Sequence, residues 1–179
     1  MTKTVLIVSA SFRKGSHSDR LAEEFARGAL ESGNAVEKIR LSEQKIDFCR
    51  GCFACQKTGQ CVIRDDMAEI LIKMKESDLI VFATPIYFYG MCGAMKNFLD
   101  RTFPLYPNQQ HFRKVYLIAA AEENLDTTIQ GVQTGLEGWI RCFDSVGLSG
   151  TIFAGGVTDR EDIEGHPALH EAYIAGKKL

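Results

Sequence analysis

The stretch Val5–Asp19 constrains the fold of this chain most strongly. It begins with four apolar, mostly β-branched residues, Val5–Val8, and such an unbroken run is typical of a strand buried on both faces of a parallel sheet. A loop with four serines, one glycine and the cations Arg13 and Lys14 follows, and an amphipathic helix begins near Ser18. Free backbone N–H groups and the helix dipole make such a strand-to-helix loop a natural anion site. We therefore predict that it binds a phosphate.

The composition of this serine loop restricts which phosphate compound it can bind. The loop lacks the G-x-x-x-x-G-K-[ST] pattern of a nucleoside-triphosphate P-loop. It has one glycine, Gly15, where the dinucleotide-binding pattern needs three, so a pyrophosphate site is disfavoured. A hydroxyl-rich loop with little glycine fits a single terminal phosphate better. The alternative, that the serines only cap the helix and the basic pair is solvated, stays open at this point.

Composition excludes several classes of function. The 21 basic and 23 acidic residues give a net charge of −2, so we expect neither a nucleic-acid nor a membrane-surface partner. The length fits one domain, residues 1–179. We identify no export signal and no apolar run near the roughly 20 residues of a membrane helix. Six cysteines without an export signal predict a reduced, cytoplasmic protein, in which closely spaced cysteines favour metal or redox chemistry over disulfides.

Apolar runs and helical periodicities alternate five times along the chain. Strands are expected at residues 5–8, 36–41, 78–83, 115–121 and 148–153, and helices near residues 18–31, 65–74, 95–103, 127–143 and 168–177. Near-continuous apolar strands joined by helices predict an α/β fold with a parallel sheet and helices on both faces. Asp65 and Asp66 open the second helix, and N-capping explains them more simply than metal binding.

Three loops of chemical interest follow the carboxyl ends of predicted strands. They are the serine loop, the aromatic loop Ile86–Gly90 and a loop that starts at Glu122. Open α/β sheets bind ligands at this edge, so we expect the three loops to converge. A flat heteroaromatic ring could stack on Tyr87 or Phe88, although these aromatics could also simply complete the core. A phosphate at one end and a flat ring at the other describe flavin mononucleotide (FMN).

Three motifs together resemble those of one known family. The first is Ala10-Ser11-Phe12-Arg13-x-x-Ser16-His17-Ser18, similar to a G-S-P-R-x-x-S-N-T phosphate loop except at its first and third positions. The second is Thr84-Pro85-Ile86-Tyr87 followed by Lys96-x-x-x-Asp100-Arg101. The third is Cys49-x2-Cys52-x2-Cys55-x5-Cys61 followed by Asp65-Asp66-Met67. Over nearly its whole length the chain resembles the flavodoxin-fold NAD(P)H-dependent FMN reductases, particularly their iron–sulfur flavoprotein branch.

The resemblance implies a flavodoxin-like, five-stranded parallel sheet in the order 2-1-3-4-5, with FMN as the cofactor. The residues implied for the FMN phosphate are Ser9, Ser11, Arg13, Ser16, His17 and Ser18, and those for the isoalloxazine ring are Pro85, Ile86, Tyr87, Phe88, Tyr89, Gly90, Ala121 and Glu122. His17 is expected to act through its backbone N–H. No catalytic side chain is identified, because the chemistry would belong to the cofactor. A homodimer or homotetramer is also implied.

The implied activity is the transfer of electrons from NAD(P)H through FMN to a quinone, a flavin or another small acceptor. The alternative is an FMN electron carrier or redox sensor, with or without an iron–sulfur cluster, that acts with a protein partner. A two-component receiver domain would need an acidic pocket after the first strand, where this chain has Ser9-Ala10-Ser11. A Cys-x5-Arg phosphatase is excluded because no cysteine is followed by arginine six positions later.

The four cysteines Cys49, Cys52, Cys55 and Cys61 allow two interpretations. Their C-x2-C-x2-C spacing matches the first three ligands of a bacterial ferredoxin and differs from the distant pairs of a zinc knuckle. The resemblance accordingly implies a [4Fe–4S] cluster. Against this, no proline follows Cys61, and small cysteines can simply pack a loop as a wall near the flavin. We expect FMN as the resident cofactor and the cluster as an optional addition.

Overall fold

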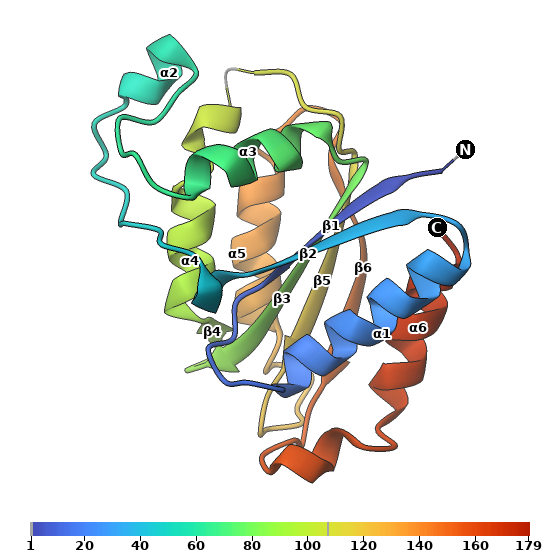
Figure 1. The fold of residues 1–179 in the computed structure, drawn as a ribbon. Coiled ribbons are helices and arrows are strands. Elements are labelled where there is room, and N and C mark those ends of the chain that lie inside the picture. The colour runs from blue at the N-terminus through green and yellow to red at the C-terminus, as the bar shows by residue number, and fades with distance from the viewer. Residues whose placement is uncertain (1, 107) are drawn as a thin grey trace.

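A parallel sheet of five strands forms the centre of the computed structural model, which describes residues 2–106 and 108–179. Its strands are β1 (Thr4–Ser9), β2 (Ala35–Arg40), β3 (Leu79–Tyr87), β5 (Lys114–Ala120) and β6 (Gly147–Ala154). They lie in the order β2-β1-β3-β5-β6 (Figure 1). The predicted flavodoxin-like fold and strand order are confirmed. A two-residue strand, β4 (Gly90–Met91), pairs antiparallel with β3, so the predicted fourth and fifth strands are β5 and β6.

Both faces of β1 are buried, which explains its unbroken apolar run. Leu6 and Val8 belong to one hydrophobic cluster, and Val5 and Ile7 belong to the cluster on the opposite face of the sheet. Successive side chains of a strand point to opposite faces, so a strand covered on both sides needs apolar residues at every position.

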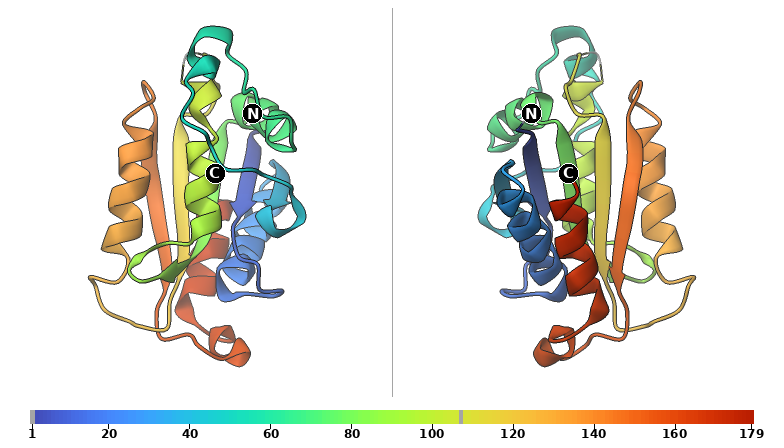
Figure 2. Two further views of the ribbon diagram at one scale, coloured as in Figure 1. Left: turned by 90° about the vertical axis from the view of Figure 1, so that its left-hand side faces the viewer. Right: turned by 90° about the vertical axis from the view of Figure 1, so that its right-hand side faces the viewer.

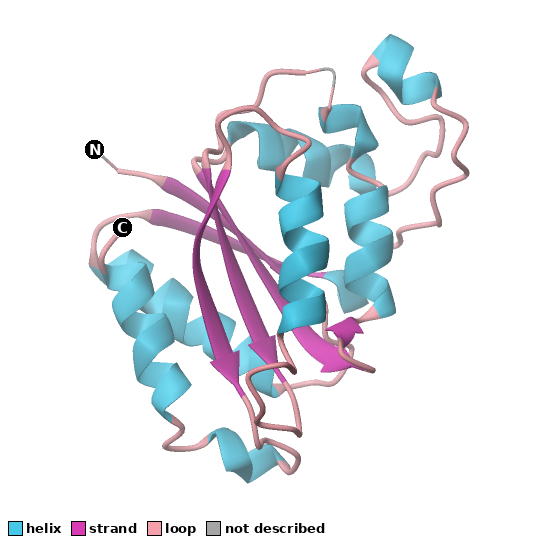
Figure 3. Cartoon of the chain, turned by 180° about the vertical axis from the view of Figure 1, so that it is seen from behind, coloured by secondary structure: helices cyan, strands magenta, loops and turns pink. Residues whose placement is uncertain are grey.

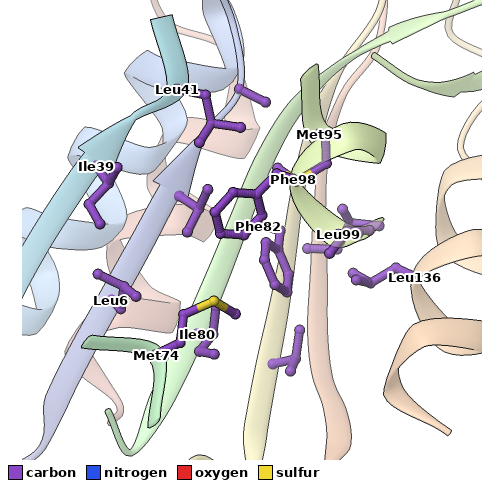
Figure 4. Packing of buried hydrophobic residues seen from close by; sticks show 14 of the residues in the cluster. Leu6, Ile39, Leu41, Met74, Ile80, Phe82, Met95, Phe98, Leu99 and Leu136 are labelled. Carbon is purple, nitrogen blue, oxygen red and sulfur yellow. The ribbon is translucent and has the colours of Figure 1, made fainter. Parts of the chain in front are cut away.

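Helices cover both faces of the sheet, as predicted (Figure 2, Figure 3). One face is covered by α1 (His17–Glu31) and α6 (Pro167–Lys177), and the other by α3 (Met67–Glu76), α4 (Gly93–Asp100) and α5 (Gln130–Ile140). The rings of Phe82 on β3 and Phe98 on α4 have their centroids 6.3 Å apart. Figure 4 shows both side chains within the hydrophobic cluster on this face. Among the residues that the structure describes, no helix has the length and apolar character that crossing a membrane requires.

Several elements differ from the predicted boundaries. β3 continues through Pro85 to Tyr87, beyond the predicted end at residue 83. α5 is shorter than the predicted 127–143, because the chain before it forms a turn in which Thr128 N–H donates to the carbonyl of Leu125. Between the second and third long strands, where the sequence predicts no regular element before residue 65, the structure has the short helix α2 (Ala54–Thr58). Short 3₁₀-helices lie at η1 (Leu41–Glu43), η2 (Phe103–Leu105) and η3 (Arg160–Ile163).

Helices α1 and α6 pack backbone against backbone through two glycines. A Cβ atom on Gly28 would lie 2.1 Å from the carbonyl oxygen of Tyr173, and one on Gly176 would lie 2.0 Å from that of Phe25. Real Cβ atoms do not approach a backbone oxygen this closely, so neither position can take a side chain unless the helices separate. This contact fixes α1, whose first turn belongs to the serine loop.

We predict that Gly28→Ala destabilises the protein although alanine is the better helix former. The inserted methyl group overpacks the α1–α6 contact, which should lower the free energy of unfolding by about 1–3 kcal/mol. Gly138→Ala in α5 is the matched control, because nothing lies within 4 Å of its Cβ position. That change should stabilise the protein by about 0.5–1 kcal/mol. Urea denaturation of both variants measures the two effects, and stabilisation by both would contradict the close contact.

Candidate functional site

The three predicted loops do meet at one edge of the sheet, and a fourth loop after β6 joins them (lower part of Figure 1). Backbone hydrogen bonds connect them: Ala10 N–H donates to the carbonyl of Ala83 at 2.8 Å, and Ala121 N–H donates to that of Ala154 at 2.9 Å. Val157 N–H donates back to the carbonyl of Ala121 at 3.1 Å. The site is therefore built on the rigid ends of paired strands.

The serine loop has the geometry of an anion site. Ser16 is the N-cap of α1, and its Oγ accepts a hydrogen bond from Asp19 N–H at 3.3 Å. Its hydroxyl also lies 3.5 Å from that of Ser18. Ser11 Oγ accepts from Arg13 N–H at 3.3 Å and so shapes the turn. The first N–H groups of a helix have no partners within the helix, so the N–H groups of His17 and Ser18 are suited to an anion.

A buried carboxylate supports this loop from behind. Asp19 is 1% exposed, and its Oδ1 accepts from Ser9 Oγ at 2.8 Å and from Lys38 Nζ at 3.2 Å. Arg40 pairs with its other oxygen. Two cations from β2 therefore balance a negative charge that would otherwise repel a phosphate. The hydroxyl of Ser9 is directed at Asp19, and Ser9 supports the loop from below.

A cavity of about 230 Å³ unites residues from all four loops. Ten of the predicted site residues line it: Ser11, Arg13, Ser16, His17, Ser18, Pro85, Ile86, Tyr87, Ala121 and Glu122. Four others, Ser9, Phe88, Tyr89 and Gly90, are not among its lining residues. The sequence reasoning missed Ala120, Val157 and Thr158; Gly155-Gly156 after the last strand was the one signal of a functional turn there.

The fourth loop is anchored to the serine loop by side chains. His17 Nε2 lies 2.8 Å from the carbonyl oxygen of Asp159, to which it donates, and Arg13 Nη1 donates to that of Thr158 at 3.2 Å. Because the His17 ring is held in this way, its backbone N–H is the group that remains for a ligand. The role expected for His17 in binding a phosphate stays a prediction.

The aromatic segment is a β-hairpin rather than an open loop. Ile86 and Tyr87 belong to β3 and pair with Met91 and Gly90 of β4. The turn residues Phe88 and Tyr89 have φ angles of 50° and 61°, the positive values of a tight hairpin turn, which glycine and asparagine usually supply. Non-glycine residues in this region carry strain, a recurrent property of ligand-binding segments.

The hairpin separates the three aromatic side chains. Tyr87 lines the cavity and is 60% exposed, whereas Phe88 at the tip is fully exposed. Tyr89 points to the next loop, where its hydroxyl donates to Glu123 Oε1 at 3.2 Å. This hydrogen bond, with the nearby charge of Glu123, raises the pKa of Tyr89. Tyr87 is therefore the aromatic side chain placed to contact a ring in the cavity.

A second cavity of about 460 Å³ adjoins the first and shares Arg13, Pro85 and Tyr87 with it. Its walls are mainly apolar, and the side chains of Phe12 and Phe48 at its rim are 67% and 78% exposed. A cavity of this size and character fits a small organic molecule. The two cavities are therefore continuous with each other beside β1 and β3.

The four cysteines form a separate site. They line a cavity of about 60 Å³ that also includes Arg101, at the end of α4 farthest from the sheet edge (α2 and its loops, upper left in Figure 1). Within residues 2–106 and 108–179, they line neither cavity described above. The alternative that they form a wall near the flavin is therefore not supported. Burial, and then the neighbouring thiols of Cys61, Cys49 and Cys52, raise the pKa of Cys55.

The four thiols do not converge on one position where a single metal ion could bind. In the part of the chain that the structure describes, no three cysteine, histidine or carboxylate groups converge as a single metal ion would require. A cubane cluster is wider than one ion, and its ligands stand farther apart. The donor set of four thiols around one cavity therefore fits a cluster better than zinc.

A buried ion pair closes the cysteine loop. Arg101 donates to Asp65 Oδ2 at 2.6 Å and to Oδ1 at 2.9 Å, and both side chains are 1% exposed. Arg101 Nη1 also donates to the carbonyl of Asp47 at 2.6 Å, and Asp47 N–H donates to Asp65 Oδ2 at 2.9 Å. Asp65 Oδ1 accepts from Met67 N–H at 3.2 Å, so the predicted capping role is one part of a larger network.

The strand order, with a ligand cavity beside β1 and β3, defines the flavodoxin-like class of α/β proteins. Within this class the chain belongs to the NADPH-dependent FMN reductase family, whose model matches residues 3–132.

Proteins similar to this chain include two iron–sulfur flavoproteins and a quinone oxidoreductase. The chain is 36% identical over 132 residues to an iron–sulfur flavoprotein of Methanocaldococcus jannaschii, covering 72% of this chain and 68% of that protein. An iron–sulfur flavoprotein of Archaeoglobus fulgidus is 36% identical over 97 residues, which cover 54% of this chain but only 44% of that protein. The structure of an NAD(P)H:quinone oxidoreductase from Methanothermobacter marburgensis has the same fold, with a TM-score of 0.74, 19% identity and coverage of 100% and 98%.

We predict that Asp65→Asn strongly destabilises the protein at neutral pH. Removing one partner of a buried ion pair costs about 3–5 kcal/mol, because the guanidinium of Arg101 stays buried without its counter-charge. Asp100→Asn is the matched control, since its pair with Lys96 is exposed and should contribute less than about 1 kcal/mol.

The effect of Asp65→Asn should also depend on pH. Burial alone would raise the pKa of Asp65, but hydrogen bonds from Arg101 and Asp47 N–H outweigh it and hold this pKa below its usual value. The stabilisation by the carboxylate is therefore complete above the unfolded-state pKa, near pH 4, and is lost as pH falls through the folded-state value. In urea titrations, the difference between wild type and variant should stay constant from pH 7 to about 5 and shrink in stronger acid.

Proposed function

We propose that the chain binds FMN in the 230 Å³ cavity and acts as an NAD(P)H-dependent oxidoreductase that reduces a quinone, a flavin or another small acceptor. The observation that carries this proposal is the continuity of the cavity from the hydroxyl-rich N-terminus of α1 to Tyr87 on β3. One end suits a phosphate and the other a flat ring. We further propose that residues 1–179 form one FMN-binding domain.

The phosphate end has the donors that a dianion needs. Ser11, Ser16 and Ser18 bring hydroxyl groups, the first turn of α1 brings backbone N–H groups, and Arg13 brings a cation. The carboxylate nearest this end, Asp19, is neutralised by Lys38 and Arg40. The residues present therefore fit the phosphate of FMN.

The ring end brings a flat wall and backbone groups. Pro85, Ile86 and Tyr87 form one side, and Ala121 and Glu122 form the edge. When bound, FMN would supply the redox chemistry, taking a hydride from NAD(P)H and passing electrons to the acceptor. The chain's own contribution is to bind and orient the ring, and no side-chain acid or base is required for it.

The second cavity suits the acceptor. It shares Arg13, Pro85 and Tyr87 with the FMN cavity, so a molecule in it would lie beside the cofactor. Phe12 and Phe48 offer apolar rings for contact with a flat acceptor, and Gln44 offers a polar amide. This combination favours an aromatic, carbonyl-bearing compound such as a quinone.

A specific observation favours a second cofactor, a [4Fe–4S] cluster held by Cys49, Cys52, Cys55 and Cys61. The four thiols line one cavity beside the buried cation of Arg101, which suits an anionic cluster. The relatives named as iron–sulfur flavoproteins support the same proposal. A bound cluster would transfer single electrons, as an electron carrier requires. We also propose that the protein is a homodimer or homotetramer and that it is cytoplasmic, where proteins seldom contain disulfides.

Removing phosphate contacts should weaken FMN binding. Ser11→Ala and Arg13→Ala should each lower affinity by about 1.5–3 kcal/mol, or roughly 10- to 150-fold in Kd, the usual contribution of a hydrogen bond to a charged group. Arg20→Ala is the control, because Arg20 lies on α1 but pairs with Glu23 and Glu164 at the surface. Titration of the apoprotein by flavin fluorescence measures all three.

Riboflavin separates the two ends of the site, because it lacks the phosphate. Its affinity should be insensitive to Arg13→Ala but should fall in Tyr87→Ala, whereas Phe88→Ala should change little because Phe88 is fully exposed. Unchanged riboflavin binding in Tyr87→Ala would remove the ring assignment. FMN affinity equal to wild type in both Ser11→Ala and Arg13→Ala would remove the phosphate assignment.

Steady-state assays distinguish the enzyme from the electron carrier. The FMN-loaded protein should oxidise NADH or NADPH with a quinone or free flavin as acceptor. Phe48→Ala should raise KM for the quinone several-fold and leave FMN affinity unchanged, since Phe48 lines the second cavity and is not among the lining residues of the FMN cavity. No pyridine-nucleotide oxidation with any acceptor would favour the carrier.

Iron and acid-labile sulfide should accompany FMN in protein purified without oxygen. About four of each per chain are expected, and both should be lost in Cys52→Ser. Cys142→Ser is the matched control, because Cys142 lies on the surface after α5 and outside the cysteine cavity. Anaerobic protein with FMN but without iron would rule out the cluster and leave the FMN proposal standing.

A further inference from the structure

Arg101 is among the largest fully buried side chains of the protein, with 1% of its surface exposed. It lies just after α4, on the wall of the cavity that the four cysteines line. Burying a guanidinium is costly unless its charge is balanced and its donors are satisfied. The partners of its five N–H groups therefore indicate what the residue does.

The closure of the cysteine loop uses only part of this donor set. Nη1 donates to the carbonyl of Asp47 and to Asp65 Oδ2, and Nη2 donates to Asp65 Oδ1. The remaining Nη2 donor lies 3.7 Å from Cys61 Sγ. Nε is buried and has no acceptor among the residues that the structure describes. Two of the five donors therefore take no part in the contacts with Asp47 and Asp65: one donates to Cys61, and Nε has no partner among the described residues.

A lysine could balance the charge of Asp65, but it could not do both tasks. The planar fork of arginine binds the two carboxylate oxygens side by side while its other edge faces a different partner. Here that partner is the sulfur of Cys61. Hydrogen bonds to ligand sulfurs and nearby charge are the means by which proteins set the potential of iron–sulfur clusters.

We propose that Arg101 is a positioning residue for the cluster: it fixes Cys61, donates to its sulfur and raises the cluster's reduction potential. The inference rests on the cluster part of the proposed function. Adding an electron makes a cluster more negative, so a fixed cation stabilises the reduced form. Asp65 has the opposite charge at almost the same place, which gives the two residues opposite expected effects.

The test is a set of redox titrations on anaerobically purified, FMN-loaded protein with its iron and sulfide measured. Arg101→Met should shift the oxidised-to-reduced equilibrium at least tenfold towards the oxidised form, which is about 59 mV more negative for one electron. Arg101→Lys keeps the charge opposite Asp65 but loses the fork, and should shift the potential in the same direction by less. If Arg101→Met does not fold, the potential of Arg101→Lys tests the inference in its place.

Two further variants separate donation to the sulfur from simple loosening of the loop. Asp65→Asn opens the same ion pair but leaves the Arg101 donor, and removing a negative charge should leave the potential unchanged or raise it. Lys96→Met removes a cation from the exposed side of α4 and should match wild type. A lower potential in Arg101→Lys together with an unchanged or higher potential in Asp65→Asn supports the inference.

Three results would overturn the inference, and each has a different cause. Equal downward shifts in Arg101→Lys and Asp65→Asn would mean that both variants only loosen the loop, which overturns the inference. A wild-type potential in Arg101→Met with full iron content would overturn it and leave the cluster standing. Wild-type protein without iron and sulfide would overturn the cluster and the inference together, while FMN binding would still be judged by its own titration.

Discussion

The parallel pairing of β1 with both β2 and β3 is the interaction on which the rest of the structure depends. The chain leaves β1, returns beside it as β2, and then crosses to its other side as β3. The connections on the two sides of β1 therefore diverge, and they open a crevice at the carboxyl end of that strand. The serine loop, the hairpin and the 230 Å³ cavity all lie at this point. Because backbone hydrogen bonds join the ends of these strands, the sheet sets the distances between the loops that follow them.

Helix α4 relates the two candidate sites to each other. Its first residues, Gly93 and Ala94, line the second cavity at the sheet edge, and its last residue, Asp100, lines the cysteine cavity. Eight helical residues span about 12 Å at 1.5 Å per residue. The second cavity and the cysteine cavity therefore adjoin opposite ends of one helix, which is packed on the sheet through Phe98.

Local patterns in the sequence predicted most of the sheet, because a buried strand such as β1 must be apolar at every position. The residues of the candidate site came from the family resemblance, and ten of the fourteen line the cavity. Features that depend on distant residues were not predictable. The N-cap pattern at Asp65 gives no indication of Arg101, which lies 36 residues further along the chain. Similarly, Ser9 resembles a phosphate ligand until Asp19 is seen to accept its hydroxyl. The hairpin was missed because Phe88 and Tyr89 occupy turn positions that glycine or asparagine normally mark.

The ends of the cysteine loop are joined at its base. Lys45 N–H donates a hydrogen bond to Asp66 Oδ2 at 2.7 Å, and Asp66 N–H donates one to the carbonyl of Lys45 at 3.2 Å. Next to them, Asp47 N–H donates a hydrogen bond to Asp65 Oδ2. A segment whose ends already touch can change in length at little cost, since doubling a loop costs only about 0.6 kcal/mol in closure entropy. The segment between them can therefore diverge in evolution as a module. Its cysteines can be gained, lost or replaced while the sheet and the crevice beside β1 keep their form.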